Sequence, residues 1–430
     1  MPAAAEYAEQ GIEDLSSAEG WFPMIDFELE PQVLKQTGMY HMAAEQMMRP
    51  ISREYDENEH GEPLQFWETM WTASQSLGPA AEGKPAKEGD KSPRLRNLFT
   101  CLSVEELCWG DAGLFLSIPG GGLGGAAVAA AGTPDQRERF LKRFREGKPK
   151  WGAMAITEPS CGSDSAAITT TATRDGDHWV INGTKIFCTA GHMAAQKSDG
   201  FVVVWATVDR KAGRAGIKPF VVEHNTPGMT VVRVEDKMGI RASDTAMIVF
   251  DNCRVPVDHI LGSAEVKNDG GGFRDVMATF DATRPIVAAM AIGVGRAALD
   301  FVRDFLKDQK IPLRYGISPR RLTVIERDFM EMEVQLKAAR LLTWRAAWML
   351  DLGMRNNLEA SMAKAKAGKA VTLITQKAVE LMGPLGYSRN QLVEKWMRDA
   401  KINDIFEGTQ QINLMIIARR ILNYSSKELN

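Results

Sequence analysis

The spacing of apolar residues changes twice along the chain and divides it into three stretches. Between residues 30 and 150, apolar residues recur every three or four positions near 31–48 and 103–118, which predicts helices. The run Thr133-Pro134-Asp135-Gln136 combines an N-cap, a proline at the first helical position and a capping-box glutamine. We therefore expect a helix to begin at Pro134 and to stop by Gly147.

From about residue 151 to 265 the apolar spacing has the period of two that is typical of strands. The segment His178–Phe187 is predicted to be two β-rich runs joined at Asn182-Gly183, a strong hairpin signal. Further β-branched and aromatic runs follow, separated by Gly, Pro and Asn. This spacing predicts an antiparallel barrel or sandwich and not a parallel sheet with crossover helices.

Helical spacing returns at about residue 272 in four long amphipathic segments, at 284–307, 320–353, 361–383 and 411–426. Four such helices are typical of a helix bundle. The predicted fold class is therefore α+β and multidomain, with an N-terminal α-helical domain (1–150), a central antiparallel β-barrel (151–268) and a C-terminal four-helix bundle (269–430).

Composition narrows the function classes. Of the 430 residues, 44% are hydrophobic and 25% charged, and the formal net charge is −3. This charge provides no basic face for nucleic acid, and no apolar run approaches the ~18 residues of a membrane-spanning helix. The five cysteines form no C-x-x-C pair and the six histidines no H-E-x-x-H, so we expect reduced thiols and no metal site. Without a signal or transit pattern at the N-terminus, a cytoplasmic protein is expected.

The stretch Ser117–Gly132 contains Gly120, Gly122 and Gly125 in the literal spacing G-x-G-x-x-G. In a Rossmann unit this motif follows a strand, and an acidic residue ends a second strand about 20 positions on. Here Pro119 directly precedes the first glycine, and the acidic residues at that distance lie in the capped helix. A turn with close helix packing is therefore favoured over a dinucleotide cradle.

Glu407 lies at the joint between two helical runs, beside Gly408, and Thr409 is placed to cap the last helix. A carboxylate at such a joint can leave the helical surface and face a cavity. On this segment alone, a solvated glutamate at a helix end is the more common arrangement, so both interpretations stay open.

Several segments together resemble the acyl-CoA dehydrogenase flavoproteins. The segment 154–190 is similar to that family's T-E-P-x-x-G-S-D block and its N-G-x-K-x-x-x-T hairpin. Further blocks match in the same order, namely "DKMGIRASDTAMIVFDNCRVP", "FDATRPIVAA" and "VEKWMRDAKINDIFEGTQQI". The resemblance covers roughly residues 100–425, and more weakly 30–100, and medium-chain-like members look most similar.

The resemblance implies a helical–barrel–helical subunit, usually a homotetramer, that binds FAD where the barrel meets the bundle. It implies α,β-dehydrogenation of an acyl-CoA thioester to the enoyl-CoA, with electrons passed on to an electron-transfer flavoprotein. In such a reaction a carboxylate removes the α-proton while a hydride leaves the β-carbon. A dry pocket raises the pKa of the base, and hydrogen bonds to the thioester carbonyl stabilise the developing enolate.

The family's functional residues map onto this sequence one by one. Glu407 matches the catalytic base, and its backbone N–H would bind the thioester carbonyl. Other members place the base at the position of Thr283, which cannot act as one. The resemblance implies FAD contacts at Met154, Ile156, Thr157, Ser163, Phe187, Thr189 and Thr409. It implies substrate contacts at Ser163, Asp281, Arg284, Arg345 and Gly408.

The chain departs from the family where a neighbouring subunit usually meets FAD. The R-x-x-F-G segment is replaced by "KDQKIPLRYGISPRR", in which Arg314 is the candidate arginine. The Q-x-x-G-G segment is replaced by "ELMGPLGYS", with Glu380 at the glutamine position and Gly383 retained. A charged insert at 78–94 replaces a P-x-x-Y-G-G segment. We expect FAD's adenosine end to be held differently, or a dimer or hetero-oligomer with a paralogue to supply the missing contacts.

In the resemblance, Pro119, Gly120 and Leu123 fall on the wall at the deep end of the acyl cavity, where relatives carry larger side chains. This predicts a wide cavity and a bulky or cyclic acyl group. Two other functions remain alternatives: a flavin monooxygenase-type relative that activates oxygen, and a non-catalytic partner subunit. The Glu-Gly-Thr segment at Glu407 weighs against the first, and purification without bound flavin would favour the second.

Overall fold

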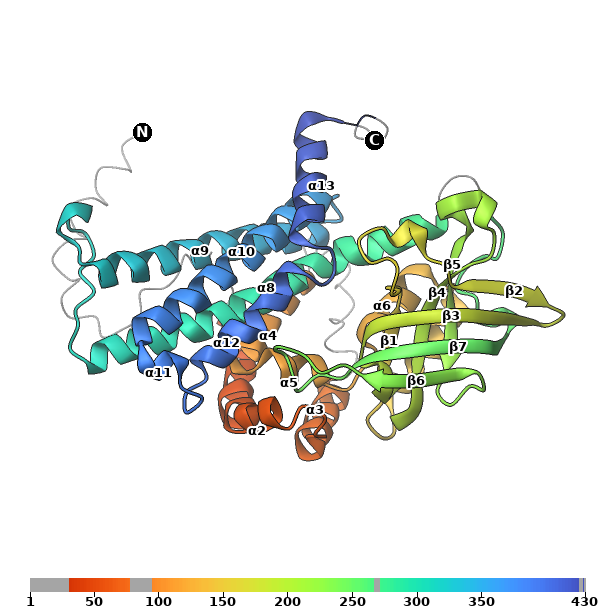
Figure 1. Cartoon of the computed structure of the whole chain (residues 1–430), viewed down its shortest axis with the longest axis horizontal. Coiled ribbons are helices and arrows are strands. Elements are labelled where there is room, and N and C mark those ends of the chain that lie inside the picture. The colour runs from red at the N-terminus through yellow and green to blue at the C-terminus, as the bar shows by residue number, and fades with distance from the viewer. Residues whose placement is uncertain (1–30, 78–94, 267–270, 425–427, 429–430) are drawn as a thin grey trace.

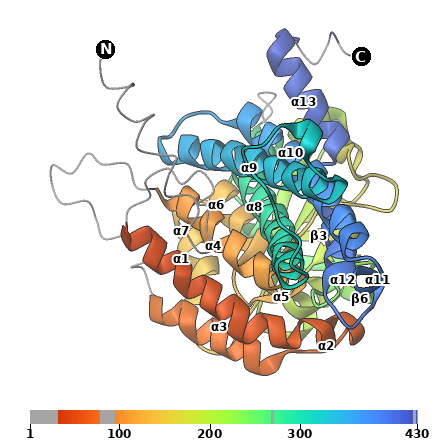
Figure 2. The same cartoon turned by 90° about the vertical axis from the view of Figure 1, so that its left-hand side faces the viewer.

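The computed structural model describes residues 31–77, 95–266, 271–424 and 428, which form a helical body beside a β-sheet (Figures 1 and 2). The insert at 78–94 lies outside the described residues. The first part of the chain is helical: α1 Pro31–Ala43, α2 Ser52–Glu57, α3 Leu64–Leu77, α4 Arg96–Gly110, α5 Ala112–Ser117, α6 Gly122–Ala131 and α7 Pro134–Leu141.

The predicted capping box at the start of α7 is confirmed. Thr133 Oγ1 accepts the N–H of Gln136 at 3.3 Å, and Gln136 Oε1 accepts the N–H of Thr133 at 3.0 Å. These two bonds satisfy two of the N–H groups that every helix start leaves without partners. The helix ends at Leu141 and a 3₁₀ turn, Lys142–Arg145, leads to Gly147.

The middle of the chain forms one seven-stranded sheet in the order β1-β4-β2-β3-β7-β6, with β5 paired to β4. The pairings β2–β3, β3–β7, β4–β5 and β6–β7 are antiparallel, whereas β4 runs parallel to β1 and meets β2 in parallel at a single residue pair. The strands are β1 Gly152–Ala155, β2 Thr171–Asp175, β3 His178–Thr189, β4 Phe201–Thr207, β5 Ile217–Glu223, β6 Met229–Val234 and β7 Thr245–Pro256.

The hairpin predicted at Asn182-Gly183 is wrong, because β3 passes through both residues without a turn. The chain reverses earlier, at Gly176, whose φ of 61° suits glycine. Gly183 lies where the register between β3 and β7 shifts, and a Cβ there would be 2.3 Å from Thr170 Oγ1. The glycine therefore marks a bulge with a close chain approach and not a turn.

The last part of the chain is helical again: α8 Gly271–Asp308, α9 Val324–Asp351, α10 Asn357–Met382, α11 Pro384–Tyr387, α12 Val393–Ala400 and α13 Gln410–Leu422. Buried residues of α8, α9, α10 and α12 share one hydrophobic core with α4. In contrast, α13 rises from the part of the helical body nearest the sheet and leaves apolar side chains exposed, namely Leu414, Met415, Ile421 and Leu422 (Figure 1).

Among the residues that the structure describes, one segment, Thr283–Asp308 of α8, is long and apolar enough to cross a membrane, contrary to the expectation from the sequence. In the structure 83% of its apolar window is buried among other helices. The segment is thus the central helix of the core, and its apolar character is explained by packing on all sides.

A buried charge cluster joins all three parts of the chain. Lys395 Nζ on α12 donates to Asp399 Oδ2 at 2.5 Å and to Asp111 Oδ2, at the start of α5, at 2.7 Å. Asp399 Oδ1 accepts the N–H of Ile240, between β6 and β7, at 2.6 Å. Gly239 is needed beside it, because a Cβ there would lie 2.5 Å from the carbonyl group of Arg398.

Candidate active site

The predicted FAD contacts from two separate segments come together at one end of the sheet. The chain that leaves β1 crosses the end of β3, where the N–H of Ile186 donates to Thr157 O at 2.9 Å. Cys188 Sγ lies 3.4 Å from Met154 O and Lys185 Nζ donates to Ile156 O at 3.0 Å. Met154, Ile156 and Thr157 thus line up against the strand that carries Phe187 and Thr189.

Glu158 anchors this segment from inside. Its carboxylate accepts the N–H and hydroxyl groups of Thr169 and Thr170 at 2.6–2.9 Å and the ammonium group of Lys185 at 2.8 Å. Burial alone would raise the pKa of Glu158, but Lys185 and the threonine bonds outweigh it and lower the pKa to about 2. The segment that follows, which includes the exposed Ser163, therefore begins at a residue that is held firmly in place.

At this end of the sheet, packing does not explain the backbone conformation and the exposure of Phe187. Its φ is 57°, which is unfavourable for a bulky residue, and 60% of its surface is exposed. An exposed aromatic ring held by a strained backbone offers a flat face to a ligand. Thr189 follows on the same strand, half-buried.

Glu407 lies in the connection between α12 and α13, which we call the base loop (residues 405–409). Glu407 and Gly408 both have left-handed φ values, 50° and 94°. Thr409 caps α13 as predicted, with its hydroxyl accepting the N–H of Ile412 at 3.3 Å. Lys364 Nζ on α10 and Asn413 Nδ2 both donate to Gly408 O, at 2.7 and 2.9 Å.

The left-handed turn directs the Glu407 carboxylate inward and not into solvent. Its Oε2 is buried and has no hydrogen-bond partner among the described residues. Burial raises the pKa of Glu407, whereas a hydrogen bond with Thr283 and the charges of Lys364 and Arg284 lower it; the net direction is upward. The structure thus brings together the two positions, Glu407 and Thr283, at which the resemblance places a catalytic base.

The predicted substrate contacts differ in where the structure places them. Arg284 follows Thr283 on α8, is buried, and acts electrostatically on both Glu407 and Lys364. Arg345 lies exposed on α9. Asp281 lies in α8, but the position of its side chain is not among those that the structure describes.

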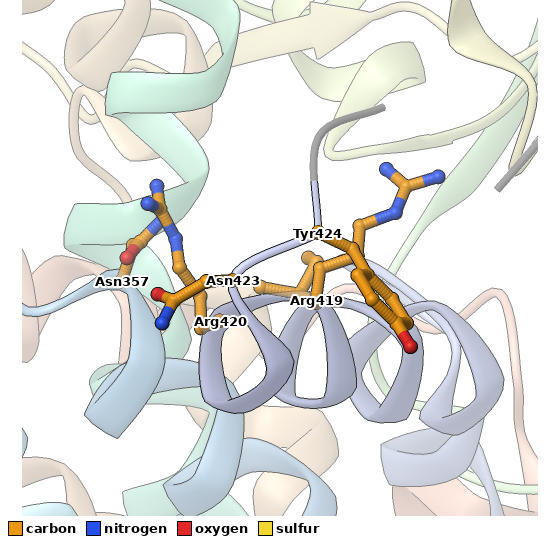
Figure 3. Close-up of a pocket in the computed structure, with 6 residues that line it drawn as sticks. Asn357, Arg419, Arg420, Asn423 and Tyr424 are labelled. Carbon is orange, nitrogen blue, oxygen red and sulfur yellow. The ribbon is translucent and has the colours of Figure 1, made fainter. Parts of the chain in front are cut away.

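A pocket of about 450 Å³ lies along α13 and was not predicted from the sequence. Apart from Ile416 its lining is cationic and polar: Asn357, Arg419, Arg420, Asn423 and Tyr424. In Figure 3 the side chain of Arg420 extends toward Asn357 of α10, whereas that of Arg419 extends toward the side of Tyr424. The two adjacent arginines are visible in the sequence and could have suggested an anion site. The sequence, however, gave no reason to place their helix beside α10.

The glycine-rich stretch is no phosphate cradle, since helix α5 and not a strand leads into it. Gly124 permits a close approach, because a Cβ there would lie 2.5 Å from Ala153 O on β1. Gly120 differs, since a Cβ on it would meet nothing within 4 Å. Pro119 is buried beside it, whereas the half-buried Leu123 packs against the core between α6, α7 and the sheet.

Three family models match consecutive parts of the chain: the acyl-CoA dehydrogenase N-terminal domain (36–148), middle domain (153–253) and C-terminal domain (270–422). The chain belongs to the acyl-CoA dehydrogenase family. The predicted fold, the enzyme class and FAD as its cofactor are thereby confirmed.

Several relatives of this acyl-CoA dehydrogenase are named for short acyl chains. A short-chain-specific acyl-CoA dehydrogenase of Clostridium acetobutylicum is 34% identical over 92% of this chain and all of that protein. The structure of butyryl-CoA dehydrogenase from Megasphaera elsdenii is 32% identical, with a TM-score of 0.79 over 93% of this chain and all of that one. A structure described for the electron transferring flavoprotein of Acidaminococcus fermentans matches with a TM-score of 0.79 and 30% identity, over 93% and 100%. The resemblance to medium-chain-like members is therefore corrected to a short-chain-like one.

The residues at the end of the sheet fit FAD. The exposed ring of Phe187 suits a planar isoalloxazine, and the backbone and hydroxyl groups near Thr157 and Ser163 suit hydroxyl and phosphate oxygens. In this acyl-CoA dehydrogenase the candidates for the adenosine end have other roles within the chain. Arg314 donates from Nε and Nη2 to the carboxylate of Glu326, both at 2.7 Å.

Glu380 is exposed and pairs with Lys377 at 2.9 Å, so its side chain also has a partner within the subunit. Gly383 ends α10 with a φ of 56° and has open space where a Cβ would lie. Both residues are accessible on the surface of the C-terminal helices, and their contact with FAD of a second subunit remains a prediction.

Proposed function

We propose that this acyl-CoA dehydrogenase removes the α-proton of an acyl-CoA thioester with the carboxylate of Glu407. The observation that carries the assignment is the inward, buried carboxylate, whose Oε2 has no hydrogen-bond partner in the described part of the chain. A carboxylate in such a place is a stronger base than one in water, because burial raises its pKa. The hydroxyl of Thr283 orients it without competing for the proton.

The thioester carbonyl is to be held by the backbone N–H of Glu407, so that enolate charge develops against a hydrogen-bond donor. The left-handed turn at Glu407 and Gly408 is the means by which one residue presents both its carboxylate and its N–H to the same substrate. FAD, held by Phe187, Thr189 and the segment after β1, supplies the acceptor for the β-hydride when it is bound.

We place the phosphates of CoA in the pocket beside α13. Arg419 and Arg420 provide two guanidinium groups, which bind phosphate through paired N–H donors. Asn357 lies seven residues before Lys364 on α10, about 10 Å along the helix axis. The pocket therefore lies beside the same two helices that hold the base loop, at a distance that the pantetheine arm would span. Arg284 lies nearer to Glu407, and we expect it to contact the same acyl-CoA molecule between this pocket and the base loop.

For the acyl group we propose a compact, branched or cyclic chain. The relatives named for short chains favour a short cavity, and the resemblance, which assigns the wall of the acyl cavity to Pro119, Gly120 and Leu123, favours a wide one because Gly120 carries no side chain. We also propose that electrons pass to an electron-transfer flavoprotein, that the subunits form a homotetramer, and that the protein is cytoplasmic. The exposed apolar side chains of α13 support self-association.

The base assignment is tested by anaerobic bleaching of the flavin with acyl-CoA. Glu407→Gln should bind the thioester but reduce the flavin about 10²–10⁴-fold more slowly, the usual contribution of a general base. The matched control Glu331→Gln, on the exposed face of α9, should bleach at the wild-type rate. Bleaching by Glu407→Gln at the wild-type rate would refute the assignment.

The substrate proposals need separate measurements. A panel of straight, branched and ring-bearing acyl-CoA thioesters should give the highest kcat/KM with a branched or cyclic member. A wide preference for butyryl-, octanoyl- or palmitoyl-CoA would overturn the acyl proposal alone. Arg419→Gln should raise KM for the thioester and leave kcat nearly unchanged, since CoA phosphates are bound equally throughout the reaction.

A further inference from the structure

Lys364 is an unusual residue for the interior of α10. Only 1% of its surface is exposed, and burial of an ammonium group is unfavourable unless the charge has a partner. Within the described part of the chain, its one hydrogen-bond partner is the neutral carbonyl of Gly408, at 2.7 Å. The ammonium group also lies 5.9 Å from the centre of the Phe406 ring. Both contacts are with the base loop.

The base loop needs external support because of its backbone conformation. Glu407 is a non-glycine residue with a φ of 50°, and Gly408 follows with 94°. Such conformations persist only where surrounding contacts fix them. The carbonyl of Gly408 is fixed by Lys364 from α10 and by Asn413 from α13. Lys364 is thus the contact that ties the backbone of the loop to α10, beside the side-chain contact of Glu407 with Thr283 on α8.

We infer that Lys364 is a positioning residue for the base: it fixes the turn that carries Glu407, and its positive charge keeps the Glu407 carboxylate ionised and ready to accept the substrate's proton. This inference rests on the proposed role of Glu407 as the base. We assign it a positioning role and not a catalytic one, because its ammonium group donates to the carbonyl of Gly408, in the loop that carries the base.

The other groups around Glu407 do not replace this charge. From α8, Thr283 provides a neutral hydroxyl, and Arg284 provides a cation that we expect to contact CoA. From the turn before the loop, the carboxylate of Asp404 acts on Lys364 and has its own partners in Lys401, at 3.0 Å, and Thr372, at 3.3 Å. Once Arg284 is engaged by the substrate, Lys364 remains as the cation assigned to the base.

The electrostatics agree with a charge that acts at neutral pH. Burial lowers the pKa of Lys364 to about 8, with Glu407 and Asp404 opposing the shift and Arg284 adding to it. The group is therefore mostly protonated at pH 7. Burial raises the pKa of Glu407, and Lys364 is one of the groups that limit this rise. Without the ammonium charge the pKa of Glu407 would rise further, so that at a given pH a larger fraction of the base would be protonated and inactive.

The test is the pH dependence of flavin reduction in the FAD-loaded enzyme, measured by stopped flow with a saturating acyl-CoA. In Lys364→Met the midpoint of the acidic limb should move to higher pH by about one unit, so that the rate below the midpoint falls about tenfold. The rate on the alkaline plateau should fall much less. Lys364→Arg, which keeps the charge, should restore the wild-type midpoint.

A matched control is available two residues further along the same helix. Lys366 donates to Gln335, away from the base loop, so Lys366→Met should keep the wild-type midpoint. If Lys364→Met lowers the rate equally at every pH, or if Lys364→Arg fails to restore the midpoint, the inference is overturned. Should Lys364→Met bind no FAD, the comparison of Lys364→Arg with Lys364→Gln provides the same readout.

Failure of the base assignment gives a different result. If Glu407→Gln still reduces the flavin at the wild-type rate, Glu407 is not the base, whatever Lys364 does. If Glu407→Gln is inactive and the midpoint of Lys364→Met is unchanged, the base assignment stands and only the role of Lys364 is rejected.

Discussion

Two buried lysines of the C-terminal helices, Lys364 and Lys395, have opposite surroundings. Lys395 lies between two carboxylates, Asp111 and Asp399, which raise its pKa above the ordinary value although burial lowers it. Lys364 has a carbonyl as its partner, and burial prevails and lowers its pKa to about 8. The burial of the two side chains is alike, so the partners decide the outcome. The charge of Lys395, which joins parts of the chain, is balanced by two carboxylates. The charge of Lys364, beside the base loop, has no such partner among its described contacts and can act on Glu407.

Removal of Lys395 should have the largest effect on stability. Lys395→Met leaves two buried carboxylates without their cation, and we expect a loss of about 3–5 kcal/mol in the free energy of unfolding. Urea denaturation at pH 7 measures it. Lys364→Met should lose far less, because it also removes an unfavourably buried charge. Equal losses in the two variants would show that the partners do not matter.

The alkaline pH dependence of stability sharpens the same contrast. Lys364 has a lowered pKa, so its buried charge destabilises the fold below pH 8, and this effect disappears between about pH 8 and 10.5. Wild type should gain stability on the order of 3 kcal/mol relative to Lys364→Met over that range, because the folded state binds the proton of Lys364 less tightly than the unfolded state does. Lys395, with a raised pKa, contributes stability that is lost as the pH rises above 10.5. Parallel curves for wild type and Lys364→Met would contradict the lowered pKa.

A third buried lysine, Lys185, pairs with Glu158 and extends the contrast to acid pH. The pKa of Glu158 is lowered to about 2, so its stabilisation is complete above pH 4.5 and is lost as the pH falls toward 2. Glu158→Gln should cost about 2 kcal/mol at pH 7, because glutamine keeps part of the hydrogen bonding. Thermal unfolding against pH should show the two curves converging near pH 2. A constant difference down to that pH would exclude the ionised carboxylate as the cause.

The smallest effect is expected where the ion pair is on the surface. Arg139 Nη1 and Asp258 Oδ2 are 2.6 Å apart, yet 47% and 60% of their side chains are exposed. Solvent screens such a pair, so Asp258→Ala should change the free energy of unfolding by less than about 1 kcal/mol. Urea denaturation with and without added salt measures it. A change as large as that of Lys395→Met would undermine burial as the deciding variable.

Much of the fold could be predicted because local patterns determine it. The periods of apolar residues gave the order of helices, strands and helices, and the Thr133 box marked the start of α7. The Asn182-Gly183 hairpin failed because the same dipeptide serves a bulge when another chain, here at Thr170, approaches closely. Only the tertiary structure supplies that neighbour.

The candidate site was predicted from ordered family blocks, and the structure adds what such blocks do not contain. Glu407 could be named from its segment, but its contact with Thr283 joins residues 124 positions apart. Lys364 lies in an alanine-rich helix and gave no signal of its own. Arg314 matched a motif only loosely, and its pairing with Glu326 depends on how the loop after α8 folds back.

The carboxylate of Asp399 has a consequence for anyone who recombines this enzyme with its relatives. The family models divide the chain into three pieces, but this side chain holds an amide of the middle piece and shares a lysine with an aspartate of the first. In a chimera with the middle piece of a relative, the backbone at the positions of Gly239 and Ile240 would have to fit against α12 of this protein, which is foreign to it. Successful exchanges should therefore carry the α12 segment along with the sheet, so the transferable unit is discontinuous in the gene.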